Sequence, residues 1–454
     1  MKKLNSLIVA LFLSASMFTS CKNNDEEEVV VQLTPETLSG QITSNKTLTA
    51  DRVWLLSGYV RVMDGATLTI EPGTIIRGIK GSTAAALIIE RGGKINASGT
   101  ADKPIVFTSN EAAGARNIGD WAGVIICGKA PVNQAGGEAQ YEGGVLGTDV
   151  AKYGGGASPV AADNSGVLKY VRIEYAGNAI QQDKEINSLT LAGVGSGTTI
   201  ENVQVSFGGD DGFEFFGGTV NCKNLIAYRC TDDDFDFEYG YVGRIQFAVS
   251  IKDPNIYDAS SSGASNGIEC DNGATVNDVP ANKPMLSNFT FIGPGVNANT
   301  KHNAGVIFRK GTRFVLRNSI IVDHLKAAFE LATVEAGDRL FAGESEFKNN
   351  LVWGNQATYK VSTAGTNFAD ATALATFSAL PANSNTTLAN AAAAGITSTT
   401  LTAPNLTLAT GSAAKTGANF TGISGFETVT YRGAMDTNNW ASGWASWTPN
   451  SNTY

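Results

Sequence analysis

The chain has 454 residues, of which 43% are hydrophobic and 17% are charged, and it contains 51 glycines. This is the composition of a folded protein, and so much glycine indicates many turns and few long helices. A formal net charge of −9 argues against binding to nucleic acid or to anionic lipid headgroups. Such a charge suits cations or neutral glycans better.

The first twenty residues have the pattern of a secretory signal peptide. Lys2 and Lys3 precede an apolar stretch, residues 4–18, that is too short to span a membrane comfortably. Small residues then lead to Cys21, in a segment that resembles the lipobox of bacterial lipoproteins. This resemblance implies cleavage before Cys21 and lipidation of its thiol, and two or more acyl chains would anchor the protein stably in a membrane. The alternative is an ordinary cleaved signal followed by an incidental cysteine.

Residues 21–45 are interpreted as an acidic linker. The run from Lys22 to Glu28 resembles the surface-export signal of Bacteroidota lipoproteins, which implies an outer-membrane lipoprotein exposed on the cell surface. A solvated spacer on the periplasmic face is the alternative. Loss of Lys2 and Lys3 would leave 31 basic residues against 42 acidic ones, a net charge of about −11.

From about Trp54 onward, the chain consists of short β-branched and apolar runs separated by Gly, Asn and Asp. Residues 67–76 alternate and turn at Pro72-Gly73, and residues 87–95 and 104–108 follow as further runs. Each run predicts a strand of three to six residues. The strands follow one another too closely for helical crossovers between them.

An internal repeat then specifies how the strands are arranged. Residues 202–205 match residues 224–227 at an offset of 22, and residues 210–215 match residues 232–237 at the same offset. Such self-similarity is typical of a solenoid, here a parallel β-helix of about 22 residues per coil. Coils with insertions repeat the turn asparagine, which tolerates a left-handed backbone, at three further positions: Asn288, Asn318 and Asn349.

Strand parity assigns side chains to the inside or the outside of each coil. The predicted interior pairs are Phe213/Phe215, Phe235/Phe237, Ile268/Cys270 and Phe329/Leu331. The predicted outward column contains Thr190, Glu214, Asp236, Glu269, Ile307 and Glu330, and a second column contains Phe216, Glu238, Asp271 and Arg309. The four cysteines after Cys21 fit no zinc motif and are predicted mainly as interior residues, with a disulfide left open.

Residues 67–108 and 202–240 resemble the opening and middle coils of the pectin-lyase-like superfamily. Residues 431–434 and 440–447 resemble the ends of Bacteroidota β-helix lipoproteins. The resemblance implies an all-β, single-stranded right-handed parallel β-helix, here predicted over residues 46–355. It does not imply one function, because the superfamily includes lyases, hydrolases, adhesins and proteins without known activity.

The remaining residues, 356–454, are predicted to form an irregular capping region. Residues 356–425 are rich in Ala, Thr, Ser and Asn, and residues 388–394 suggest a short helix. Trp440, Trp444 and Trp447 are expected to seal the end of the solenoid, because an open end needs a cover and large aromatic rings bury well. Stacking on sugars is the alternative for these tryptophans.

The acidic residues of adjacent coils are the main candidates for function. Like charges on neighbouring strands destabilise a sheet, so a cation, a basic partner or a raised pKa must offset them. The predicted calcium ligands are Glu214, Asp236, Glu238, Glu269 and Asp271, since calcium accepts six to eight oxygen ligands. Asp210 and Asp232 are expected instead to cap turns by accepting backbone N–H groups.

Two classes of function follow from the acidic residues. Asp211 and Asp233 on successive coils could act as a glycoside hydrolase pair, and Arg309 could act as the base of a calcium-dependent polysaccharide lyase. Against the hydrolase, the Gly-His-Gly of polygalacturonases is absent, and the adjacent Arg309 and Lys310 are expected to face opposite sides of a strand. The sequence therefore favours a non-catalytic module that binds a polysaccharide or a cell-surface protein.

Overall fold

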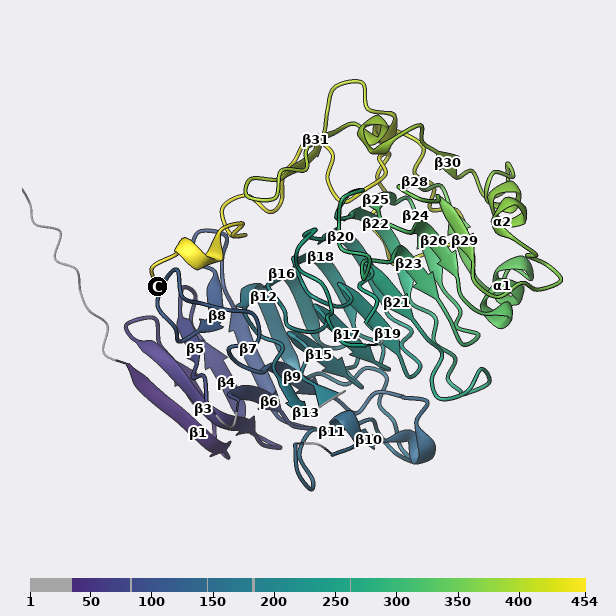
Figure 1. The fold of residues 1–454 in the computed structure, drawn as a ribbon. Helices are drawn as coiled ribbons and strands as arrows, with labels where there is room; N and C mark the ends of the chain where they lie inside the picture. The colour runs from purple at the N-terminus through teal and green to yellow at the C-terminus, as the bar shows by residue number, and fades with distance from the viewer. Residues whose placement is uncertain (1–34, 82–83, 145, 182–183, 262) are drawn as a thin grey trace, which may run out of the picture. The chain divides into compact units, whose positions relative to one another are not determined.

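Twenty-six strands among the described residues form one sheet that coils around a continuous hydrophobic core (Figure 1). The computed structural model describes residues 35–81, 84–144, 146–181, 184–261 and 263–454. The predicted signal peptide, Cys21 and most of the predicted linker lie outside these residues. Neighbouring strands of the sheet pair in parallel, for example β16 with β18 and β17 with β19. This arrangement confirms the predicted right-handed parallel β-helix.

The coils stack their strands into three parallel ladders. The first ladder contains β2 (Lys46–Leu48), β4 (Thr67–Ile70), β7 (Lys94–Ser98), β24 (Val315–Arg317) and β27 (Glu346–Lys348). The second contains β1 (Glu36–Ile42), β5 (Ile75–Gly78), β8 (Ile105–Ser109), β25 (Ile320–His324), β28 (Leu351–Gly354) and β30 (Thr386–Thr387). Five longer strands run through both: β12 (Gly166–Glu174), β16 (Thr199–Ser206), β18 (Asn221–Tyr228), β20 (Arg244–Ile251) and β22 (Met285–Ile292).

The third ladder carries the predicted acidic columns. It contains β6 (Ala86–Ile89), β9 (Gly123–Cys127), β15 (Leu189–Ala192), β17 (Phe213–Phe216), β19 (Phe235–Glu238), β21 (Ile268–Cys270), β23 (Ala304–Phe308), β26 (Ala327–Leu331) and β29 (Tyr359–Val361). The long strand β3 (Val53–Val62) joins the second ladder to the third. Three antiparallel hairpins lie outside the main sheet: β10 (Ala139–Gln140) with β11 (Lys152–Tyr153), β13 (Ala179–Gln181) with β14 (Lys184–Glu185), and β31 (Ile396–Ser398) with β32 (Asn405–Leu408).

The interior confirms the predicted parity and the 22-residue register. Phe213 stacks on Phe235 with ring centroids 5.1 Å apart, and Phe215 stacks on Phe237 at 4.9 Å. All four rings are fully buried. The turn asparagines have left-handed backbones with φ between 54° and 59° at Asn202, Asn224, Asn288, Asn318 and Asn349. Asparagine tolerates this conformation better than most residues, which explains why it recurs at this corner.

Strands also occur outside the predicted range 46–355. Strand β1 begins at Glu36, inside the segment interpreted as a linker, and β29 and β30 add rungs beyond residue 355. Two α-helices occur among the described residues, α1 (Val334–Phe341) and α2 (Ala371–Ser378). The short helices are η1 (Ala135–Gly137), η2 (Tyr141–Gly144), η3 (Ala391–Ala394), η4 (Ala413–Lys415) and η5 (Pro449–Ser451). Only the second half of the predicted helix 388–394 is therefore helical.

The prediction that the C-terminal tryptophans seal the end of the solenoid is wrong. Instead, Leu374 on α2 and Phe368 just before α2 pack into the core beside the last coils. The chain then returns along the coils, drawn in yellow in Figure 1, as a segment we call the strap, residues 416–454. Trp444 is fully buried in a second cluster with outward residues of the second ladder, including Ile226 and Val249. The tryptophans thus bury their aromatic area against a lateral face.

Amide and guanidinium side chains on the coils hold the strap in place. Gln204 donates to the carbonyl oxygen of Ser446 and accepts its N–H, both at 2.8 Å. Gln246 makes the same pair of bonds with the backbone of Glu427, at 2.7 and 2.8 Å. An amide side chain presents one donor and one acceptor, so it can replace a neighbouring strand for one residue. The two glutamine side chains therefore hydrogen-bond to the backbone of the strap as a neighbouring β-strand would.

All four cysteines after Cys21 are buried and free of disulfides. Cys222, Cys230 and Cys270 belong to the interior core, as predicted. Cys127 belongs instead to a third cluster, in which the insertion before β12 covers the outer face of the third ladder. No helix among the described residues is long and apolar enough to cross a bilayer.

Candidate functional site

An acidic cleft of about 400 Å³ opens on the outer side of the third ladder. Turns of successive coils form its floor, and insertions form its walls, including Asp258, Ser260, Gly263 and Ala264. Eight of its thirteen described lining residues are acidic: Glu185, Asp210, Asp211, Asp232, Asp233, Asp236, Asp258 and Glu269. One, Arg309, is basic. The parallel stacking explains this concentration, because equivalent positions of neighbouring coils lie only about 4.8 Å apart.

The register of the third ladder confirms the predicted outward column. Glu214 pairs with Asp236, Asp236 pairs with Glu269, and Glu269 pairs with Ile307. The column is less accessible than an outer face would suggest, since Glu214 is only 4% exposed. The insertions, which the repeat does not describe, cover these carboxylates. Burial makes their charge harder to solvate.

Asp211 and Asp233 belong to a ladder of side chains that join one coil to the next. Asp211 accepts the N–H of Asp233 at 2.8 Å, and Asp233 accepts the N–H of Asn266 at 2.7 Å. The ladder continues on either side with asparagines. Asn187 accepts the N–H of Asp211, and Asn266 accepts the N–H of Ala304. A neutral amide oxygen is therefore sufficient for this structural role. The negative charge of the two aspartates needs another explanation.

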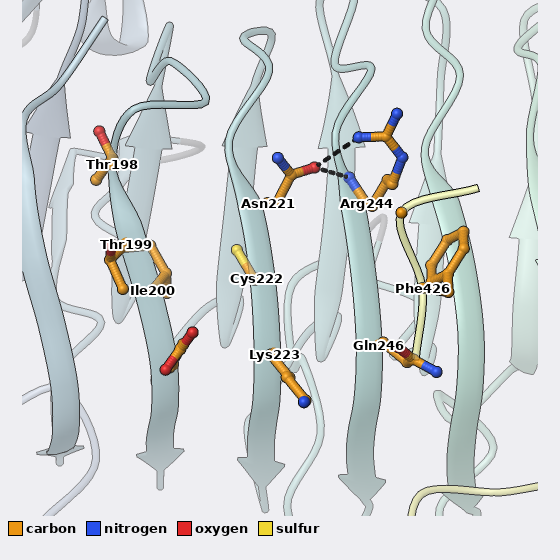
Figure 2. Close-up of a pocket in the computed structure, with 11 residues that line it drawn as sticks. Thr198, Thr199, Ile200, Asn221, Cys222, Lys223, Arg244, Gln246 and Phe426 are labelled. Atoms are coloured by element: carbon orange, nitrogen blue, oxygen red, sulfur yellow. Dashed lines mark hydrogen bonds between the residues drawn. The ribbon is translucent and has the colours of Figure 1, made fainter. Parts of the chain in front are cut away.

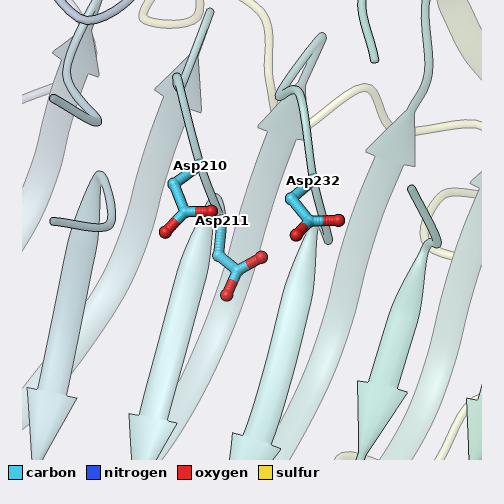
Figure 3. Close-up of side chains that lie close together, drawn as sticks. All are labelled: Asp210, Asp211 and Asp232. Atoms are coloured by element: carbon cyan, nitrogen blue, oxygen red, sulfur yellow. The ribbon is translucent and has the colours of Figure 1, made fainter. Parts of the chain in front are cut away.

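Asp210 and Asp232, predicted to cap turns, point into the cleft instead. Figure 3 shows Asp210 and Asp211 in the turn before β17 and Asp232 in the equivalent turn of the next coil. The backbone N–H groups of these turns are accepted by Asp211 and Asp233. The turn-capping prediction therefore chose the wrong member of each pair. Which of two adjacent residues faces the backbone depends on the turn geometry, which the residue types alone do not determine.

Burial raises the pKa of the cleft carboxyls. The pKa of Asp211, Glu214 and Asp236 lies well above the ordinary range, because burial disfavours the charged form and neighbouring carboxylates add repulsion. Burial also raises the pKa of Asp233, to about 6, although Lys252 opposes the shift. Burial is also the main reason why the pKa values of Asp210, Asp232 and Glu269 are raised. The fold therefore favours the protonated form of these carboxyls at a higher pH than is usual for a carboxyl group.

Three groups of carboxylates have oxygens close enough to share a metal ion. The groups are Asp210/Asp211/Asp232, Asp211/Glu214/Asp236 and Asp233/Asp236/Glu269, each with ligand atoms within 4.8 Å of one another. Asp211 and Asp236 each belong to two of the groups. Two oxygens in the groups, Oε1 of Glu214 and Oδ1 of Asp236, are buried and accept no hydrogen bond from an N–H or a hydroxyl group of the described residues. Buried carboxylate oxygens are rarely left in this state.

The predicted ligand Asp271 and the predicted base Arg309 belong to an ion-pair network at the edge of the cleft. Arg309 donates to both oxygens of Asp271, at 2.8 and 2.7 Å, and also contacts Glu269. Lys310 pairs with Asp271 at 2.7 Å, so the expectation that Arg309 and Lys310 diverge is wrong. Lys310 has a φ of 43°, which breaks the strand alternation after β23. The two cations lower the pKa of Asp271. Neither Glu238 nor Asp271 occurs in the three metal groups.

A second hollow lies between the first ladder and the strap (Figure 2). It has a volume of about 290 Å³, and its wall includes Arg244, Lys223 and Phe426. Arg244 donates its N–H and its guanidinium to Oδ1 of Asn221, at 3.0 and 3.4 Å. Lys223 is bound to Glu427 of the strap at 2.7 Å. Lys223 and one end of the Arg244 guanidinium are thus already bonded, whereas Nε of Arg244 is buried without a partner among the described residues.

Comparison with known proteins agrees with this geometry. A family model described as a pectate-lyase-like β-helix domain matches residues 40–445. The chain belongs to this family. No curated protein and no solved structure matches the chain. Membership in the pectate-lyase-like family supports a function related to polysaccharides, without distinguishing binding from catalysis.

Part of the cleft comes from residues that the 22-residue repeat does not indicate. Glu185 and Asp258 line it from insertions, and Asn187 donates to Oε2 of Glu214 at 3.1 Å. An asparagine two residues before a strand was the available signal for Asn187, because Asn266 occupies the same place before β21. His302 is 1% exposed, and both of its ring nitrogens lack partners. It does not line the cleft, so the cleft chemistry among the described residues is that of carboxylates and Arg309.

Proposed function

We propose that this protein is a polysaccharide-binding lipoprotein that holds Ca²⁺ in the acidic cleft and uses the ion to bind glycan oxygens. The proposal includes an anchor at Cys21, attachment to the outer membrane with the β-helix at the cell surface, and no catalytic step. Family membership supports the polysaccharide, and the sequence around Cys21 supports the anchor. The carboxylates of the cleft support the ion.

The observation that carries the proposal is the pair of unpartnered oxygens on Glu214 and Asp236. Both oxygens are buried among carboxylates that would repel one another if ionised. Calcium accepts six to eight oxygen ligands at flexible angles, and the three groups supply carboxylates from successive coils. Ligand positions that the protein does not fill would be available to hydroxyl or carboxylate oxygens of a glycan.

Binding fits the cleft better than β-elimination does. A lyase needs a basic side chain that is free to remove a proton, and it must lie within hydrogen-bond reach of the substrate. Arg309 is held by Asp271 and Glu269, and these carboxylates raise its pKa further. Its arrangement is that of a counter-charge, which stabilises the rim of the cleft.

The calcium site can be tested by thermal melting of the chain from Lys22 onward. Calcium should raise the melting midpoint above that in chelator by about 3–6 °C. Glu214→Gln should remove most of this increase, yet melt close to wild type in chelator, because glutamine has the shape of the protonated acid. Glu427→Gln, which alters a strap carboxylate, is the matched control and should respond to calcium like wild type. An unchanged wild-type midpoint would contradict the calcium site. It would mean that protonation neutralises the cleft carboxylates.

Glycan binding and anchoring need their own measurements. Calcium-dependent retention of the protein by immobilised acidic or neutral polysaccharides is expected for wild type and should be lost in Glu214→Gln. Cys21→Ser should move the full-length protein from the membrane fraction to the soluble fraction, since the acyl chains provide the attachment. Loss of glycan retention without loss of the calcium response would separate the two parts of the proposal.

Glycoside hydrolysis is the second candidate, favoured by one observation. Burial raises the pKa of Asp233 to about 6, a value at which a carboxyl can donate or accept a proton near neutral pH. Asp211, which accepts the N–H of Asp233, is the second carboxyl of the pair. New reducing ends from a panel of polysaccharides, lost in Asp233→Asn, would replace the binding function with this one.

A further inference from the structure

A third cavity combines aromatic rings with arginines at the corner where the second ladder turns. Its volume is about 400 Å³, within the range of small-molecule sites. Tyr175, Phe207 and Arg229 line it from three successive coils, Arg116 from a preceding turn, and Trp447 from the strap. No acidic residue occurs among its described lining residues. Its chemistry is thus opposite to that of the acidic cleft.

The three coil residues occupy equivalent left-handed turn positions. Tyr175, Phe207 and Arg229 have φ values of 62°, 57° and 61° and follow β12, β16 and β18. Bulky side chains are unfavourable in this conformation, and the other corner of the same coils mostly uses asparagine. Packing requires them here, because Tyr175 and Phe207 stack at 5.2 Å and the Arg229 guanidinium lies 4.7 Å from the Phe207 ring centre.

Two polar groups of this stack are buried without a hydrogen-bond partner. The Tyr175 hydroxyl is one of them, on a side chain that is only 2% exposed. Nε of Arg229 is the other. Buried hydroxyls and N–H groups are almost always bonded, and leaving them unpaired is unfavourable. Both residues line the same cavity, so a ligand in it can supply the missing acceptors.

Arginines give the cavity a positive character. Arg116 is 5% exposed and donates to the carbonyl oxygens of Pro449 and Asn452, at 2.8 and 3.0 Å. Those bonds orient the guanidinium without cancelling its charge. Arg229 is held by an ion pair with Asp253 and by the faces of Phe207 and Tyr228. Guanidinium groups fixed in this way suit a carboxylate, which accepts two hydrogen bonds in one plane.

We propose that this cavity binds one acidic sugar residue, with its carboxylate on Arg116 and Arg229. A ring hydroxyl of the sugar accepts the hydrogen bond of the Tyr175 hydroxyl, and the C–H face of the ring lies against Trp447. Trp447 is half-buried and its indole meets Tyr228 edge-on at 5.1 Å, so it is held in place while still lining the cavity. This site does not depend on calcium, since its cations are side chains.

The test compares three small probes by isothermal titration with the chain from Lys22 onward. Methyl glucuronide should bind at millimolar concentration, methyl glucoside should bind at least tenfold more weakly, and acetate should give no measurable heat. Chelator should leave glucuronide binding unchanged. Equal affinity for the two sugars would overturn the role of the arginines, and loss of binding in chelator would assign the heat to the acidic cleft.

Tyr175→Phe separates binding from folding. The hydroxyl has no hydrogen-bond partner among the described residues, so its removal should leave the melting midpoint unchanged or higher, while glucuronide affinity falls about tenfold. Tyr241→Phe is the matched control, because the Tyr241 hydroxyl donates to the carbonyl oxygen of Val220 in the core at 2.8 Å. That variant should melt earlier and bind glucuronide like wild type. Wild-type affinity in Tyr175→Phe would contradict the proposal.

Discussion

Two outer faces of the same coils differ in how their charged side chains are arranged. Beside the strap, charges of opposite sign meet: Lys169 pairs with Glu201 at 3.2 Å, and Lys223 pairs with Glu427 at 2.7 Å. In the acidic cleft, Glu214 lies beside Asp236, and Asp236 lies beside Glu269. Both faces are built on the same parallel stacking of successive coils. Coil geometry alone therefore does not place like charges together.

The difference indicates which charges serve folding and which do not. Opposite charges on neighbouring strands stabilise a sheet modestly, and like charges destabilise it. A cluster of like charges that is both buried and unpaired works against folding. Proteins accept such local conflicts mainly at functional sites. The strap face is consistent with structure alone, whereas the carboxylates that line the cleft far outnumber the one basic residue there.

The same contrast occurs between two adjacent residues. Asp234 is fully buried, pairs with Lys252 at 3.1 Å and accepts a hydrogen bond from Ser250. Asp233, its neighbour, faces the cleft with one oxygen on the N–H of Asn266. Lys252 also donates to the carbonyl oxygen of Asp232, so it holds the turn from behind. One side of this turn is neutralised by the protein and the other is not.

The largest effect should come from removing the ring that attaches the strap. Trp444→Ala should lower the free energy of unfolding by about 3–5 kcal/mol, because the indole is fully buried and its loss leaves a cavity. Denaturant unfolding followed by circular dichroism measures this change. Trp440→Ala, at a half-buried ring stacked on Trp444, is the control with a smaller expected loss. Equal, small losses would mean that the strap contributes little to this face.

Breaking the internal ion pair should have an effect of similar or slightly smaller size. Lys252→Met leaves Asp234 buried without its cation, which typically reduces stability by about 3–5 kcal/mol. Replacing both partners, with Lys252→Met and Asp234→Leu together, should restore much of the loss, since the second charge is then absent. Thermal melting of the single and double variants makes the comparison. A double variant less stable than Lys252→Met would show that the pair acts through more than charge.

The outward columns could be predicted because they depend only on the repeat and on strand parity. An offset of 22 residues places Glu214 over Asp236 whatever the loops do, and the interior phenylalanines follow from the same rule. The second outward column likewise placed Asp271 and Arg309 on neighbouring coils, where the structure shows them in contact. Solenoid cores are predictable in this way, since each coil repeats the last.

Features outside the repeat could not be predicted. Glu185 and Asp258 reach the cleft from insertions, which have no counterpart on other coils. The path of the strap depends on contacts more than 140 residues distant along the chain, such as that of Ala434 with Thr290. Lys310 departs from strand alternation through a single backbone angle, so parity assigned it to the wrong side. Each failure concerns backbone geometry that residue type alone does not determine.

The smallest expected effect is a change of stability with pH, which also tests the contrast between the two faces. Burial raises the pKa of Asp233 from 3.8 to about 6 in the folded protein, and it also raises the pKa of Glu214 and of Asp236. The folded state therefore binds more protons than the unfolded state above pH 4. The stability that comes from these protons is complete below the unfolded pKa and is lost as the pH rises through the folded values.

In chelator, the melting midpoint should therefore fall by about 3–6 °C between pH 5 and pH 8. Calcium should reduce this fall, because it binds the ionised carboxylates and replaces the protons. Glu214→Gln should flatten the curve in chelator, since one titrating group is gone. Glu427→Gln should leave it unchanged, because its ion pair with Lys223 is solvent-exposed and contributes little. A midpoint that rises toward pH 8 without calcium would mean that the cleft carboxylates are already neutralised by the protein, as those beside the strap are.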